Sequence, residues 1–232
     1  VLTATGGLKP AGKKMPKYPA RPEPRRGGKA VPQPVLDAKT IIATCGMLNF
    51  EESNYANRSS DEFRRWQGKH EVERGHFTNY PEARRIFLKS FKANFPDLCR
   101  DRTIVICDCT LYSDPDHDRR LRSHLGRHPA TTQRVVESQH FLDVNKDLKF
   151  LRSDKDNLVI NVCKVGRHRS VANQGSQADA IIGNLYSGDT ASVMYFDVQA
   201  ESHWNHLCPN DCPECNDTTS ALYKSNKKEA YK

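Results

Sequence analysis

The chain has 232 residues, of which 37% are hydrophobic, and it carries a formal net charge of +8 with a pI near 9.1. It contains no run of the ~20 apolar residues that a membrane span needs, and no apolar segment follows its basic start as in a secretory signal. We therefore expect a soluble intracellular protein, cytoplasmic or nuclear, with organelle targeting by the acid-poor basic start as the alternative. Its eight cysteines are then reduced or bound to metal rather than paired in disulfides.

The positive charge is concentrated at the start of the chain. Residues 1–34 hold seven prolines and eight basic residues but a single acid, Glu23. Setting these aside reduces the 36 basic and 28 acidic residues of the chain to 28 and 27, so the remainder is nearly neutral. Such a segment buries too little apolar surface to offset the entropy of ordering. The sequence predicts a disordered tail, rich in Pro, Lys and Arg, over 1–38.

The tail contains one motif that resembles a nucleotide-binding loop. The run "GLKPAGKK" from Gly7 approaches the pattern G-x-x-x-x-G-K-[ST]. Lys14 stands where the pattern needs a hydroxyl, and no strand precedes it. We expect no nucleotide cofactor.

Strands and helices alternate over residues 39–200. Short β-branched or apolar runs predict strands in "TIIATCG" from Thr40, in "RTIVICDC" over 102–109, in 158–163 and in "SVMYFDV" from Ser192. Helical periodicity predicts helices from Pro81, over 129–141 and over 170–185, with a short helix around Phe63 and Trp66. This order predicts an α/β domain: a mixed, largely parallel sheet flanked by helices, whose ligands bind beyond the carboxyl ends of the strands.

The loop after the third strand has the composition of an anion site. It reads "CKVGRHRS", with the spacing C-x-x-G-x-x-R-S, and lies between a strand and a helix. Backbone N–H groups and the helix dipole favour an anion at such a place, a glycine allows close backbone approach, and arginine binds phosphate with paired hydrogen bonds. We interpret the loop as a phosphate site made of Cys163, Lys164, Gly166, Arg167, His168, Arg169 and Ser170.

Cysteine-dependent phosphatases share this spacing, which gives an alternative. Cys163 would then be a nucleophile that forms a phosphocysteine, Arg169 would hold the phosphoryl oxygens, and Asp114 or Asp116 would protonate the leaving group. Val162 occupies the position where such enzymes usually have histidine, so binding without turnover is favoured. A further alternative is an interaction module with a vestigial site.

Two motifs together resemble a known family. The run "CKVGRHRSV" matches a strand-end motif C-T-G-G-x-H-R-S-V at Cys163, Gly166, His168, Arg169, Ser170 and Val171. Upstream, the family has D-V-R, P-N-P, a leucine and T-G, and this chain has Asp108 with "CT", Pro115, Leu121 and Gly126 in that order. Residues 39–198 thus resemble the C-terminal domain of the RapZ family, the bacterial RNase adapter proteins. Motifs of that family's N-terminal P-loop ATPase domain are not found in these 232 residues.

The resemblance implies a binding domain for a hexosamine phosphate and for small RNA that does not hydrolyse phosphate. The ligand loop would then include Asp108, Asp116, His117 and Arg122. Lys164 and Val165 replace the family's Thr and Gly, Asp116 stands where the family has a sugar-site histidine, and Thr110 replaces an arginine. Basic tails, with Arg119 and Arg120 in the same long loop, would add salt-sensitive RNA affinity.

A cluster of soft ligands follows the α/β domain. Residues 201–216 contain His203, His206, Cys208, Cys212 and Cys215, more than the four ligands that tetrahedral zinc needs. The sequence predicts a structural zinc knob here; a redox dithiol at Cys212 and Cys215, or unligated thiols, are the alternatives. The lysine-rich residues 217–232 are expected to form a flexible basic tail.

Overall fold

Four apolar runs form one sheet in the computed structural model, which describes residues 31–47, 81–198, 206–209 and 211–230. The strands are β1 (Thr40–Gly46), β2 (Thr103–Asp108), β3 (Asn157–Cys163) and β4 (Val193–Asp197), in the order β2-β3-β1-β4. All three pairings are parallel, so the predicted α/β fold is confirmed and the sheet has no antiparallel member among the described strands. β1 and β3 are central and buried over their whole length, which agrees with their mainly apolar sequences.

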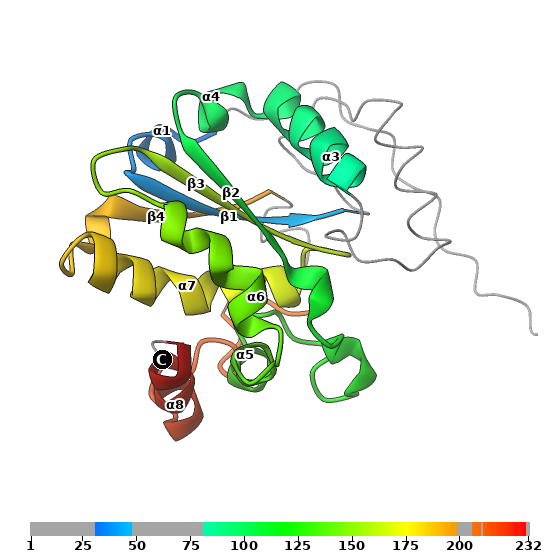
Figure 1. Cartoon of the computed structure of the whole chain (residues 1–232). Coiled ribbons are helices and arrows are strands. Elements are labelled where there is room, and N and C mark those ends of the chain that lie inside the picture. The colour runs from blue at the N-terminus through cyan, green and yellow to red at the C-terminus, as the bar shows by residue number, and fades with distance from the viewer. Residues whose placement is uncertain (1–30, 48–80, 199–205, 210, 231–232) are drawn as a thin grey trace, which may run out of the picture.

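Helices cover both faces of the sheet (Figure 1). One face carries α1 (Gln33–Leu36), α3 (Pro81–Asn94) and α4 (Pro96–Cys99); the other carries α5 (Pro129–Val136), α6 (Phe141–Asn145) and α7 (Arg169–Leu185). Short 3-10 turns connect them at Cys109–Leu111, Pro115–His117, Lys146–Phe150 and Thr190–Ser192. Among the residues described, no helix has the length and apolar character needed to cross a bilayer.

Each face of the sheet has its own apolar core. Under α3, Phe87, Phe91 and Phe95 lie against Ile41 and Ile160. The three rings form a chain, with centroids 5.8 Å apart between the first two and 4.8 Å apart between the last two. The opposite core joins strand residues such as Ile42 and Val159 to the apolar side of α7. Burial of these two layers is the main stabilising contribution to the fold.

Two predicted boundaries need correction. The predicted tail over 1–38 includes α1, whose Val35 is buried in the first core. The single helix predicted over 129–141 is two helices, because α5 ends at Val136 and α6 begins at Phe141 after a turn. The helix predicted around Phe63 and Trp66 lies outside the described residues.

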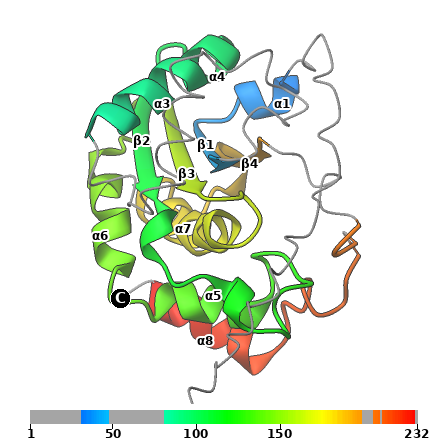
Figure 2. The same cartoon turned by 90° about the vertical axis from the view of Figure 1, so that its right-hand side faces the viewer.

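The predicted flexible tail over 217–232 is also wrong, because Ala221–Ala230 form helix α8. The Ser220 hydroxyl accepts a hydrogen bond from the Tyr223 amide at the start of this helix. Buried Asn226 donates to the carbonyl of Pro129, and Lys227 pairs with Asp179 of α7 at 2.9 Å. Figure 2 shows α8 beside α5, at the outer side of the domain. Its lysines lie on a solvated helix face, while these polar contacts attach it to the domain.

Candidate functional site

The candidate site lies where the chain diverges at the carboxyl ends of the two central strands. β1 and β3 are paired to their last residues, Gly46 and Cys163, and the Met47 amide donates to the Cys163 carbonyl at 2.9 Å. The next described helix after β1 is α3 on one face, whereas β3 leads directly to α7 on the other. Ligands of open α/β sheets bind at such points, where successive connections leave in opposite directions.

The Cys163 thiol is held inside the loop that joins β3 to α7. Only 2% of the residue is exposed. Its Sγ accepts a hydrogen bond from the Gly166 amide at 3.1 Å and lies 3.3 Å from the Ser170 hydroxyl. Gly166 has a φ of 86°, a backbone conformation that glycine adopts without strain, and this turn directs its N–H at the sulfur. The loop is therefore wrapped around the sulfur, with the Gly166 N–H and the Ser170 hydroxyl both directed at it.

Two side chains after the glycine are buried and face the neighbouring polar loop. Arg167 Nη2 contacts Asp116 Oδ1 at 2.6 Å, and His168 Nε2 lies 2.7 Å from the His124 carbonyl. A carbonyl oxygen can only accept, so the contact with the His124 carbonyl places a proton on His168 Nε2. Arg167 Nε lies 3.1 Å from the same nitrogen. Because that nitrogen carries the proton, it cannot also accept a hydrogen bond from Arg167. Burial lowers the pKa of His168 to about 4, with the Arg167 charge adding to the effect. His168 is therefore a neutral donor at neutral pH.

Arg169 joins the two loops of the site. Its guanidinium donates from Nη1 to the carbonyls of Thr110 and Tyr112, at 3.3 and 3.2 Å. Nη2 lies 3.5 Å from Asp114 Oδ2. The residue is 8% exposed and is the first residue of α7, whose N-cap His168 makes no side-chain hydrogen bond to the first turn. The cationic group and the helix N-terminus thus lie at the same edge of the sheet.

Two glycines allow the loop to approach its neighbours closely. A Cβ on Gly46 would lie 2.1 Å from the Val165 carbonyl oxygen, and a Cβ on Gly126 would lie 2.1 Å from that of His168. Both distances are to backbone atoms, so neither position accepts a larger residue without moving the chain. Gly46 and Gly126 therefore fix the position of the Cys163–Ser170 loop from two sides.

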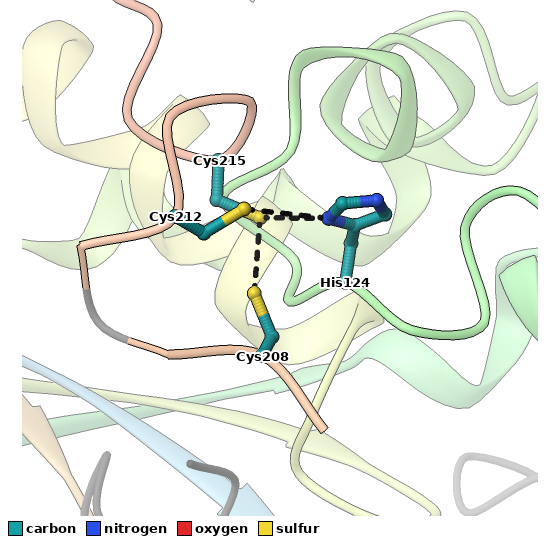
Figure 3. Close-up of side chains that lie close together, drawn as sticks. All are labelled: His124, Cys208, Cys212 and Cys215. Carbon is teal, nitrogen blue, oxygen red and sulfur yellow. Dashed lines mark hydrogen bonds between the residues drawn. The ribbon is translucent and has the colours of Figure 1, made fainter. Parts of the chain in front are cut away.

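A second cluster lies beside this loop and has the donor set of a metal centre (Figure 3). His124, Cys208, Cys212 and Cys215 direct one ligand atom each toward a common point, all within 4.8 Å of one another. Cys208 Sγ and Cys215 Sγ are 3.6 Å apart, and His124 Nδ1 lies 3.7 Å from Cys212 Sγ and 3.5 Å from Cys215 Sγ. Tetrahedral bonds of about 2.3 Å to sulfur and 2.0 Å to nitrogen separate the ligand atoms by roughly 3.5 to 3.8 Å. The cluster could hold a metal ion.

The surroundings of the cluster fit a cation. Burial raises the pKa of the Cys215 thiol to about 12 and also raises that of Cys208, so a bound cation has to displace their protons. His124 Nε2, the ring nitrogen away from the thiols, lies 3.6 Å from Glu214 Oε2. This separation is longer than a hydrogen bond, but Glu214 lies on the side of the ring from which a carboxylate can orient a metal-bound histidine.

Comparisons with protein-family models, with curated proteins and with solved structures found no match. The interpretation of the site rests on its own geometry.

The metal ligands differ from those that the sequence predicted. The three cysteines come together as expected, but the fourth ligand is His124, and exposed His206 lies outside the cluster. His203 falls outside the described residues. Sequence analysis missed His124 because it lies in a loop far upstream, where no spacing pattern connects it to the cysteines. The only signal was that C-x-x-x-C-x-x-C supplies three of the four ligands that a closed zinc site needs.

The remaining residues of the predicted ligand loop are spread over its length. Buried Asp108 caps the turn after β2, accepting from the Thr110 amide at 3.0 Å. Arg122 reaches back to the Asp116 carbonyl, from Nη2 at 2.9 Å. His117, Arg119 and Arg120 lie together on a more outward surface with Arg134. Within the predicted ligand loop, Asp116 contacts the Cys163–Ser170 loop directly, through Arg167. Lys164 belongs to the Cys163–Ser170 loop and is exposed.

Proposed function

We propose that this domain binds the phosphate group of a phosphorylated small molecule at the Cys163–Ser170 loop. The observation that carries the proposal is that two partly exposed carboxylates already contact the loop's guanidinium groups: Asp116 at Arg167 and Asp114 at Arg169. They mark positions where anionic oxygens are stabilised by cations at a helix N-terminus. A phosphate dianion would displace them and bind the same donors.

The likeness to the RapZ C-terminal domain supports the same conclusion and suggests the ligand class. A sugar phosphate, such as a hexosamine phosphate, would place its phosphate on the Cys163–Ser170 loop and its hydroxyls toward the loop that carries Asp114 and Asp116. RNA is a second partner on this proposal, contacted through exposed arginines such as Arg119 and Arg120. The identity of the sugar would be set by Asp116 in place of a histidine.

We expect phosphate compounds to stabilise the folded domain. Ligand at 100 times its dissociation constant raises the free energy of unfolding by about 2.7 kcal/mol, a melting shift of roughly 5 to 10 °C for this size of domain. Arg169→Gln removes a charge-assisted contact and should weaken affinity by about 10- to 100-fold. Thermal melting with inorganic phosphate and a panel of sugar phosphates measures both. The matched control is Lys155→Ala, an exposed lysine at the opposite end of β3, which should leave the shift unchanged.

A phosphatase activity is the second candidate, favoured by the donors around Cys163 Sγ. The Cys163 sulfur accepts a hydrogen bond from the Gly166 amide and lies 3.3 Å from the Ser170 hydroxyl, which is an arrangement that a nucleophilic cysteine can use. Cys163→Ser should then abolish phosphate release from an aryl phosphate while ligand binding persists. If the native protein releases no phosphate, the binding function alone stands.

We propose that the metal bound by His124, Cys208, Cys212 and Cys215 is zinc. Three thiolates and one imidazole are a donor set typical of structural zinc, and four protein ligands leave no position for substrate. The ion would hold residues 208–215 against the loop that carries His124 and would take no part in chemistry.

The zinc assignment predicts about one metal ion per chain, detected by native mass spectrometry or elemental analysis. Cys212→Ser should lose the metal and lower the melting temperature. Cys99→Ser, which removes a thiol in α4 on the far face of the sheet, should retain it. A native protein purified with zinc in the medium but free of metal would contradict the assignment.

A further inference from the structure

The two clusters of the candidate site share one residue. The His124 ring directs Nδ1 at the thiols of Cys212 and Cys215. The backbone carbonyl of the same residue lies 2.7 Å from Nε2 of His168, in the Cys163–Ser170 loop. A ligand that fixes the His124 ring therefore also restrains the acceptor that holds His168.

Two further contacts join the same segments. The Gly126 amide donates to the Arg167 carbonyl at 2.9 Å. Val165, from the Cys163–Ser170 loop, packs against the group formed by Leu125 and the three cysteines. Residues 124–126 thus lie between the metal cluster and the loop and contact both.

We propose that the metal centre positions the phosphate loop, so that metal and phosphate bind cooperatively, with His124 as the positioning residue. This rests on the phosphate-binding function proposed above. Without metal, no ion holds the cysteines against His124, and Val165 loses the fixed surface on which it packs. The loop that carries Arg167, His168 and Arg169 then loses its support on one side. On its other side it still packs closely against Gly46, at the end of β1.

Cooperativity of this kind is reciprocal. If metal raises phosphate affinity by some factor, phosphate raises metal affinity by the same factor. Typical couplings of about 5- to 150-fold are measurable. The effect is the ratio of two zinc affinities of the same chain, measured with and without phosphate.

The experiment measures zinc affinity of the full chain by competition with a chelating dye, with and without saturating inorganic phosphate. We expect phosphate to tighten zinc binding at least fivefold. Arg169→Gln, which cannot hold phosphate well, controls for direct contact between phosphate and zinc in solution and should show no tightening. His168→Leu removes the donor to the His124 carbonyl. With phosphate raised until it saturates this variant, the variant should keep zinc but lose the tightening, and His168→Gln, which retains an N–H donor, should recover it.

The two failures are distinguishable. Phosphate that binds the zinc-loaded protein, as seen by thermal melting, but leaves zinc affinity unchanged would overturn the coupling and keep the phosphate site. Zinc-loaded protein that binds no phosphate would overturn the proposed function and the coupling with it. Tightening that persists in His168→Leu would show that the link does not pass through His124.

Discussion

Replacing Gly46 with alanine is expected to displace the Cys163–Ser170 loop and to abolish phosphate binding. The new Cβ would lie 2.1 Å from the Val165 carbonyl oxygen and 2.6 Å from the Gly166 nitrogen. Both are backbone atoms, so the contact cannot be relieved by a side-chain rotation. Overpacking of this kind lowers the free energy of unfolding by about 1 to 3 kcal/mol, and the contact with backbone atoms places this substitution at the upper end. Urea denaturation measures the loss, and phosphate titration of the folded variant measures the site.

Gly175→Ala is the matched control for this substitution. A Cβ on Gly175, an exposed glycine in α7, would meet no atom within 4 Å. Alanine in a helix interior is more favourable than glycine by about 0.5 to 1 kcal/mol, so the control should be slightly more stable and bind phosphate normally. A Gly46→Ala protein that is as stable as the native chain and binds phosphate equally well would refute the close approach of β1 to the loop.

Phe91→Ala is expected to destabilise the domain strongly without changing the site. Phe91 is fully buried and its ring lies between those of Phe87 and Phe95. Truncating a buried phenylalanine costs about 3 to 5 kcal/mol, the lost transfer free energy plus the cavity left behind. Because α3 lies on the opposite face of the sheet from α7, the folded variant should bind phosphate with native affinity.

Urea unfolding and phosphate titration separate the two effects of Phe91→Ala. Leu142→Ala serves as its control, because Leu142 is 76% exposed and its truncation should change stability by less than about 0.5 kcal/mol. Loss of phosphate affinity in folded Phe91→Ala protein would mean that the α3 layer supports the site.

The fold could be predicted because its strands are buried on both faces. Runs such as Thr103–Asp108 are then almost continuously apolar and end abruptly in polar loops, which gives a clear sequence signal. The predicted start of α7 was within one residue of the observed start at Arg169. Helix α8 gave no such signal, because it is attached through polar contacts of Asn226 and Lys227 rather than through an apolar stripe.

The buried side of α7 was only partly predictable. Val171, Ala178, Ile181, Ile182 and Leu185 recur at helical spacing and mark an apolar face, but the half of the helix near the site buries polar side chains. Asn173 donates to Asn161 of β3 at 2.7 Å, and Asn161 donates to Gln177 at 2.7 Å. Hydropathy alone assigns such residues to the surface, because their burial depends on partners supplied by another element.

The residues of the Cys163–Ser170 loop lie together because they are contiguous, whereas the pairing of their charges depends on another segment. Asp116 and Asp114 reach Arg167 and Arg169 only through the path of the loop after β2. His124 likewise joins the cysteines through tertiary structure. A local sequence pattern encodes the helix N-terminus and its charges, but not which groups from other segments neutralise them.

The central claim is that phosphate binds at the Cys163–Ser170 loop, and amide chemical shifts test it most directly. Inorganic phosphate would be titrated into 15N-labelled, zinc-supplemented protein. We predict saturable shifts concentrated at the amides of residues 163–172, strongly reduced in Arg169→Gln and preserved in Lys155→Ala. Saturable shifts confined to the Arg119 and Arg120 surface, or no shifts at the loop at concentrations that saturate ordinary phosphate sites, would contradict the account.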